Sequence, residues 1–348
     1  MLLCRAWIVQ LGVSLLGFAL SAVCGCGCGR GRPKNDHLVP AVELQRDASR
    51  LSASLLRPGR RIVAGDTANV IYGGGYLYWV DANGIVRMAE GAETGERLVT
   101  QKRCGPLAFS HGALYWIHFD DDTNGVLSTS DVGTGKSRQL AKMRCWSTGG
   151  AHLAVFHDKI LVGGSCEPEL ATVDVKGTVS PLTHPDERHP FEQRAPYREA
   201  IPAIASSNMG AAWISQYRVY LLGEDWRARL VWDRGLSTAI ALSDTHLLWA
   251  SGRTALDVDN GPTTIRSLDL QRRNTEVIVT GAGHVFSTQA RGMKLYYTVE
   301  PDLLQVADMV TKTVKTLGKT LAGMNTVVLG NERIYVQVPQ EGIFEFIE

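Results

Sequence analysis

Beyond about residue 60, short apolar runs alternate with polar turns, and the pattern recurs along the chain. In the clearest copy, residues 75–98, an aromatic run is followed by Asn83-Gly84, a second apolar run, another turn and a last strand. A similar copy begins at Gly112 and reaches Lys136. Asn-Gly between apolar runs is a strong hairpin signal, because both residues tolerate a positive φ. With the aliphatic run that precedes each aromatic one, the pattern predicts four short β-strands per copy.

Five later copies are more degraded, and their centres lie at residues 159–162, 211–214, 246–249, 294–297 and 333–336. The mean spacing is close to the roughly 40 residues expected of one four-stranded propeller blade. No long stretch with a helical period follows residue 60, which disfavours an α/β fold. The sequence therefore predicts an all-β protein, a single β-propeller of seven blades, with six blades as the alternative.

The two ends of the repeat region complement one another. The last copy, residues 326–348, supplies only three strands, and an orphan strand at residues 60–64 precedes the first copy. Pairing the orphan strand with the last copy would complete a blade and close the ring. Closure also removes exposed strand edges, which are sites of aggregation.

The first copy resembles the YWTD class of propeller repeat and the repeats of bacterial propeller lipoproteins. The residues that carry the resemblance are Leu77-Tyr78-Trp79-Val80-Asp81, then Ile85-Val86-Arg87 and Arg97-Leu98. Val80 stands where the family has Thr, and the YWTD propellers have six blades. The resemblance implies a binding or scaffold role and transfers no catalytic site.

The N-terminal segment has the layout of a secretory signal: Arg5, an apolar run over residues 6–23 and small residues after it. Residues 23–26 resemble the bacterial lipobox, which implies acylation of Cys26. We therefore expect a lipoprotein signal peptide over residues 1–25, a tether over 26–58 and the propeller over 59–348. The protein would be exported and lipid-anchored on the periplasmic or cell-surface side. An uncleaved membrane anchor is the alternative, because the apolar run is about long enough to span a bilayer.

Composition limits the partners. Hydrophobic residues make up 45% of the chain and charged residues 20%, which suffices for a core without metals or disulfides. The net charge of +1 gives no electrostatic case for nucleic acid. We expect a monomer that binds a protein or an envelope glycan.

Strand alternation sorts the turns onto two faces. The loops between second and third strands share a face with the loops between blades. That face should carry Asp81, Asp120, Asp121, Asp122, Glu167, Asp257, Asp259, Glu300 and Asp302. The opposite face should carry Lys136, Arg138, Arg272, Arg273 and Lys312. We therefore expect charge to be segregated between the faces.

The longest interruption of the repeat is residues 183–202, and it should project from the acidic face. Long loops in a compact fold are usually functional or disordered. We take this loop as the best candidate for contacting a partner. The candidate ligand-binding residues are His184, Asp186, Glu187 and His189 in the loop, with Asp81 and His118 on the same face. The two loop histidines could also hold a metal, although no regular element aligns them.

Residues 120–125 match the opening of a calcium loop, with candidate oxygen ligands on Asp120, Asp122 and Asn124 and a glycine at the bend. Asp131 falls at the twelfth position, but an extended strand would carry it about 15–20 Å away. A solvated hairpin turn is the alternative to a calcium site. No other cofactor is expected.

Three cysteines lie in the propeller region, and an odd number leaves at least one unpaired. Cys145 and Cys166 map to one face of the third blade and are the candidate disulfide. Cys104 would then be buried or free.

Signatures of hydrolases, zinc proteases and phosphate loops are absent from the sequence, so no catalytic residue is assigned. His152 and His284 lie near the starts of innermost strands, where some propeller lyases place catalytic histidines by resemblance. The first hypothesis is a lipid-anchored binding or scaffold protein. The alternative is a propeller hydrolase or lyase that acts on a sugar or small molecule, with a histidine in the central funnel and with or without a divalent cation.

Overall fold

The computed structural model describes residues 59–147, 150–182, 203–215, 218–233, 237–252, 263–299, 302–319 and 326–348. All of them belong to one compact unit, Ser52–Glu348. Their regular structure is entirely β-strand. Within this part of the chain, no helical segment has the length and apolarity of a membrane span.

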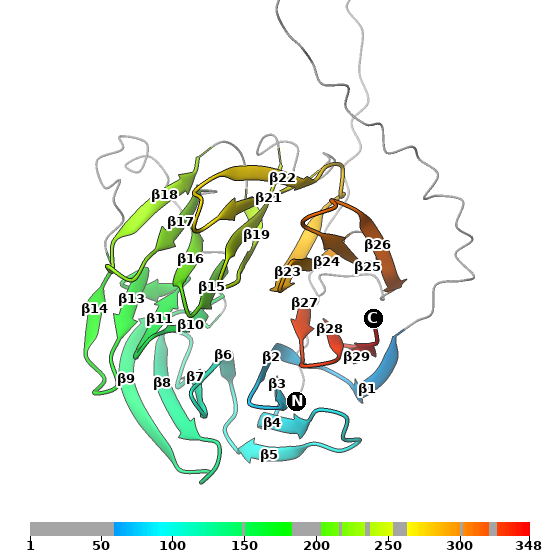
Figure 1. The fold of residues 1–348 in the computed structure, drawn as a ribbon. Helices are drawn as coiled ribbons and strands as arrows, with labels where there is room; N and C mark the ends of the chain where they lie inside the picture. The colour runs from blue at the N-terminus through cyan, green and yellow to red at the C-terminus, as the bar shows by residue number, and fades with distance from the viewer. Residues whose placement is uncertain are drawn as a thin grey trace, which may run out of the picture. The chain divides into compact units, whose positions relative to one another are not determined.

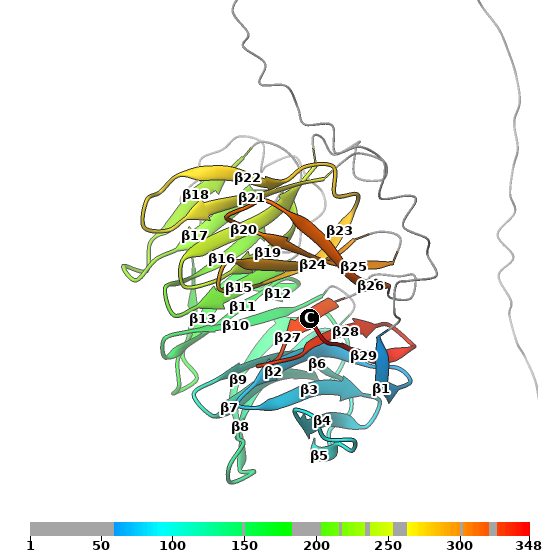
Figure 2. The same ribbon diagram turned by 45° about the vertical axis from the view of Figure 1, so that its right-hand side comes forward.

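The strands form seven sheets arranged as the blades of a β-propeller (Figures 1 and 2). Blade 1 comprises β2 (Ala68–Gly73), β3 (Tyr76–Asp81), β4 (Gly84–Ala89) and β5 (Glu96–Val99). Blade 2 comprises β6 (Cys104–Ser110), β7 (Ala113–Phe119), β8 (Asn124–Asp131) and β9 (Ser137–Cys145), with the short β12 (Cys166–Glu167) added at its outer edge. Blade 3 comprises β10 (His152–Phe156), β11 (Lys159–Gly163), β13 (Leu170–Val173) and β14 (Val179–Pro181).

The next three blades follow the same order from the innermost to the outermost strand. Blade 4 comprises β15 (Ala203–Ser207), β16 (Gly210–Ser215), β17 (Arg218–Leu222) and β18 (Ala228–Trp232). Blade 5 comprises β19 (Ser237–Leu242), β20 (His246–Ser251), β21 (Thr264–Asp269) and β22 (Thr275–Val279). Blade 6 comprises β23 (Val285–Arg291), β24 (Lys294–Val299), β25 (Leu303–Asp308) and β26 (Val314–Lys319). The predicted count of seven blades is confirmed, and the six-blade alternative is wrong.

Blade 7 closes the ring with strands from both ends of the propeller. It comprises β27 (Thr326–Leu329), β28 (Ile334–Val338), β29 (Gly342–Phe346) and, outermost, β1 (Arg60–Ala64). In Figure 1 the blue β1 lies beside the red β29, and its register pairs Arg60 with Glu345 and Ala64 with Gly342. The predicted closure is confirmed.

In every blade except blade 3, the aromatic residues of the repeat lie on the second strand, where they pack between neighbouring blades. Trp116 of blade 2 is buried against Tyr78 and Ile85 of blade 1. Trp213 and Trp249 occupy equivalent places against blades 3 and 4. This position accounts for the repeat, because each blade must fill the same space between two stacked sheets.

A second repeated feature, which the sequence analysis missed, is an aspartate at the end of the third strand. Asp131, Asp174, Asp269 and Asp308 each accept hydrogen bonds from backbone N–H groups two to four residues later. These hydrogen bonds lower the pKa of all four carboxyls. The four aspartates lie on the face expected to be basic, beside its lysines and arginines, and the segregation of charge between the faces stays a prediction.

The innermost strands of the seven blades surround a central cavity of about 290 Å³. Its lining carries no charged side chain. The lining residues are Val70, Ile71, Tyr72, Leu107, Ala108, Phe109, Leu153, Ala154, Val155, Ile204, Ala205, Ser206, Ile240, Ala241, Leu242, Gln289, Val328 and Leu329.

Candidate functional site

The strand order defines two faces of the propeller. We call the face with the second-to-third strand loops and the inter-blade connections the upper face, and the opposite one the lower face. The two longest connections, residues 182–202 and 252–263, join strand ends on the upper face. The candidate residues His184, Asp186, Glu187 and His189, together with Asp257, Asp259 and Glu300, lie outside the described residues.

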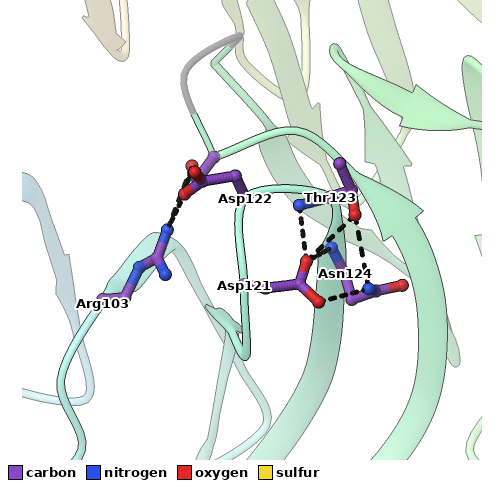
Figure 3. Close-up of polar contacts among 6 residues, drawn as sticks. Arg103, Asp121, Asp122, Thr123 and Asn124 are labelled. Carbon is purple, nitrogen blue, oxygen red and sulfur yellow. Dashed lines mark hydrogen bonds and ion pairs between the residues drawn. The ribbon is translucent and has the colours of Figure 1, made fainter.

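The upper loop of blade 2 is organised by Asp121 (Figure 3). Its carboxylate accepts hydrogen bonds from the backbone N–H groups of Thr123 and Asn124, at 2.7 and 2.8 Å, and from both of their side chains. These donors stabilise the charged form and lower the pKa of Asp121 to about 2. Asp121 therefore caps the turn.

The two neighbouring carboxylates point to different partners. Asp122 forms an ion pair with Arg103 of the preceding inter-blade connection (Figure 3). The backbone carbonyl of Asp122 accepts a hydrogen bond from the N–H of Ser147, at 3.1 Å. Asp120 lies 3.5 Å from Nε2 of His118. The loop thus joins blade 2 to both inter-blade connections that flank it.

The hydrogen bonds of residues 120–125 are relevant to the calcium prediction but do not test it. Asn124 directs its amide nitrogen toward Asp121, at 2.6 Å, and Asp131 ends β8 and caps a turn on the lower face. Among the described residues, no group of three or more His, Cys, Asp or Glu side chains is placed to hold a metal ion. The hydrogen bonds favour the solvated-turn alternative, and calcium binding stays a prediction.

We expect Asp121→Ala to lower the free energy of unfolding at neutral pH without added metal, because the turn loses its capping carboxylate. Because the folded-state pKa is depressed, the carboxylate contributes stability above the ordinary aspartate pKa near 4, and this contribution is lost as pH falls through about 2. Urea unfolding of both proteins between pH 7 and pH 2 measures the difference. If the difference in free energy of unfolding between wild type and Asp121→Ala stayed the same from pH 7 to pH 2, the capping role would be contradicted.

Asp81 and His118 lie at the upper end of the junction between blades 1 and 2. Asp81 forms a bidentate ion pair with Arg97, at 2.6 and 2.7 Å, and chiefly this contact lowers the pKa of Asp81.

His118 pairs in register with Cys104. Burial lowers the pKa of His118, although the nearby Asp120 opposes the shift. The Cys104 thiol donates to the carbonyl of Gln101, and burial raises its pKa to about 12. Asp81 is therefore engaged in structure, whereas Nδ1 of the largely buried His118 has no hydrogen-bond partner in the structure.

A disulfide joins Cys145 and Cys166, the two cysteines expected to pair. It connects the outermost strand of blade 2 to the loop of blade 3 that contains β12, and β12 pairs with β9 beside it. Arg144 lies 3.3 Å from Glu167 and stacks over the ring of Trp146, 5.3 Å from its centroid. The upper rim of blades 2 and 3 is therefore covalently braced.

Removing this disulfide with Cys145→Ser/Cys166→Ser should lower the free energy of unfolding by about 3 kcal/mol. The bond closes a loop with a sequence separation of 21 residues, and a loop of that size gives an effect of this order. Urea unfolding of the oxidised protein and of the double variant gives the difference. As the matched control, wild type under reducing conditions should lose the same free energy of unfolding as the double variant. If neither protein lost stability, the bracing role would be contradicted.

The two histidines considered for catalysis lie outside the cavity lining. His152 is half-buried at the start of β10, and burial lowers its pKa to about 4, so the imidazole is neutral at pH 7. His284 precedes β23 and packs against Phe286, with ring centroids 4.9 Å apart. The lining of the central cavity therefore includes neither histidine and no carboxylate.

Comparison with known proteins identifies the fold alone. No protein-family model matches the chain, and no curated protein sequence matches it. Among solved structures, the β-propeller domain of Myceliophteria thermophila Cps50 (Swd1) is 14% identical with a TM-score of 0.59, covering 83% of this chain and 99% of that one. An oligogalacturonate lyase in complex with manganese is 12% identical with a TM-score of 0.58, covering 82% and 92%. The tricorn protease is 12% identical with a TM-score of 0.59 over 84% of this chain, which spans only 34% of the protease chain. Because these neighbours include enzymes, the fold by itself does not select a function.

Proposed function

We propose that the protein is a lipid-anchored extracytoplasmic binding protein that recognises a protein or an envelope glycan through its upper face. The observation that carries the proposal is the difference between the faces. The described lower turns are short, and four of them are capped by their own aspartates, whereas the two longest connections join strand ends on the upper face. Recognition residues are commonly found on loops that a rigid scaffold holds in place.

The bracing of blades 2 and 3 supports this role. The disulfide, the β9–β12 pairing and the ion pair between Arg103 and Asp122 fix the upper rim next to the strand ends that flank residues 182–202. Fixing a surface before it meets a partner reduces the entropy lost on binding. Cys26 would provide the lipid that holds the protein at the membrane.

The hydrolase or lyase alternative requires an acid–base pair in one concave pocket. His152 is neutral at pH 7 and could serve as a base, and this observation favours the alternative. The uncharged lining of the central cavity favours binding over catalysis.

Site-specific photocrosslinking in the native host tests the proposal. A photoreactive amino acid replaces Asn83 on the upper face of the full-length protein, or Lys176 on the lower face as a matched exposed control. We expect adducts of defined mass from position 83 and none from position 176. They should disappear when residues 183–202 are replaced by a short Gly-Ser linker. Adducts from position 176 alone would overturn the assignment of the binding face, and labelling with radioactive palmitate in wild type and Cys26→Ser tests the lipid separately.

A further inference from the structure

An apolar cluster projects from the lower face at blades 6 and 7. Val310 in the β25–β26 turn is 68% exposed, and Ile347 after β29 is 77% exposed. Met293 and Val314 on the same blade ends are 40% and 39% exposed. These four residues, which we call the rim cluster, include the two most exposed large hydrophobic side chains of the described chain.

Contacts between backbone and side chains hold the members of the rim cluster together. The N–H of Met309, next to Val310, donates to the carbonyl of Met293 at 2.9 Å. Lys294, which follows Met293, forms an ion pair with Glu348, which follows Ile347. The cluster is therefore continuous across the junction of two blades.

Basic side chains border the rim cluster. Lys312 pairs with Glu276 of blade 5 at 3.0 Å, and Lys294 is neutralised by Glu348. The nearby carboxylates Asp269 and Asp308 are occupied as turn caps. Within the described part of the chain, Arg273 and Lys315 form no ion pair, and the capped carboxylates of Asp269 and Asp308 keep their negative charge nearby.

The N-terminal segment enters the propeller beside this cluster. A Cβ atom on Gly59 would lie 2.6 Å from the ring of Phe346, the residue before Ile347. Arg60, the first residue of β1, pairs with Glu345. Residues 27–58 lie between Cys26 and Gly59 in the sequence. A lipid on Cys26 would therefore tether the propeller through the lower end of β1, beside the rim cluster.

We propose that the rim cluster rests on the phospholipid surface, with its apolar side chains in the interfacial layer and Arg273 and Lys315 against anionic headgroups. This inference rests on the lipid anchor of the proposed function. One acyl chain gives marginal binding, and a second contact of apolar and basic residues stabilises it. The upper face would then be held away from the membrane.

A phospholipid surface fits these observations better than a second copy of the chain. The cluster consists of four exposed side chains at the turns and strand ends of two blades, far fewer than the roughly 20–30 residues that each partner contributes to a standard interface. Side chains at such positions reach an interfacial layer independently. The chain that would bear the lipid arrives at the same place.

Crosslinking to lipid tests the placement. The full-length lipidated protein is reconstituted into vesicles of phosphatidylethanolamine and phosphatidylglycerol that contain a diazirine-bearing phosphatidylglycerol. After irradiation, lipid adducts are mapped by mass spectrometry. We expect adducts on peptides containing residues 293–294, 310–315 and 347, and none on residues 82–83 or 120–124. Val310→Asp/Ile347→Asp should lower the adducts at these lower-face peptides about tenfold, because the charge opposes burial in the interfacial layer.

Matched controls separate the possible outcomes. Leu230→Asp, at an exposed apolar position on the outer strand of blade 4, should leave the adducts unchanged. Adducts on the upper face, or no adducts on an anchored protein, would overturn the inference and leave the lipid anchor standing. A dimer of the detergent-solubilised protein that Val310→Asp/Ile347→Asp dissociates would identify a second copy instead. Absence of palmitate on Cys26 would count against the anchor, whereas adducts at residues 310–315 without it would still support the lipid-facing rim.

Discussion

Replacing Arg60 and Arg333 together with methionine is expected to lower the free energy of unfolding by about 4 kcal/mol. Both guanidinium groups pair with Glu345, whose side chain is only 5% exposed. The double variant leaves this carboxylate buried and without its cationic partners, and such a loss costs several kcal/mol. Urea unfolding of the full-length protein at pH 7 measures the change.

A triple variant is the control for this prediction. Arg60→Met/Arg333→Met/Glu345→Leu removes the buried charge together with its partners, and its stability should return to within about 1 kcal/mol of wild type. If the double and triple variants lost the same stability, the effect would come from lost packing of the arginine side chains and not from an unpaired charge.

Gly342→Ala is expected to lower the free energy of unfolding by at least about 4 kcal/mol, among the largest effects of single substitutions. Gly342 has a φ of +121°, and a Cβ there would lie 2.0 Å from the carbonyl oxygen of Val63. Since β1 and β29 are paired at this point, relief of the overlap must separate the strands that close the ring. Urea unfolding and protease resistance both report the change.

Gly135→Ala is the matched comparison. Gly135 also has a positive φ, +69°, but a Cβ there meets nothing within 4 Å. We expect a loss of about 1 kcal/mol, which is the conformational cost alone. Similar losses at the two positions would show that backbone strain, and not the approach of the two closing strands, determines the effect at Gly342.

Much of the fold could be predicted because its signals are local. Trp79 and Trp116 mark the second strands, Asn83-Gly84 marks a hairpin, and the orphan strand at residues 60–64 matches the strand missing from the last blade. The placement of Asp81 and residues 120–122 on the upper face followed from strand alternation alone. A seven-bladed ring satisfied all of these signals.

Contacts between blades could not be predicted in the same way. Arg103 pairs with Asp122 because the two loops meet at one corner of blade 2, and nothing in their spacing indicates it. The capping aspartates did leave a signal in the sequence, since Asp131, Asp174, Asp269 and Asp308 each stand between the third apolar run of a copy and the polar turn that follows it.

The closing blade also determines how the protein would respond to mechanical tension. A pull on the chain before Gly59 enters the propeller at Arg60, on the outermost strand of blade 7. The first cross-strand contact to resist it is the ion pair between Arg60 and Glu345. If β1 were pulled from β29, blade 7 would lose its outermost strand and the ring would be open. The strand pair β1–β29, which closes the ring, is thus also the point at which force on the N-terminal segment would first be resisted.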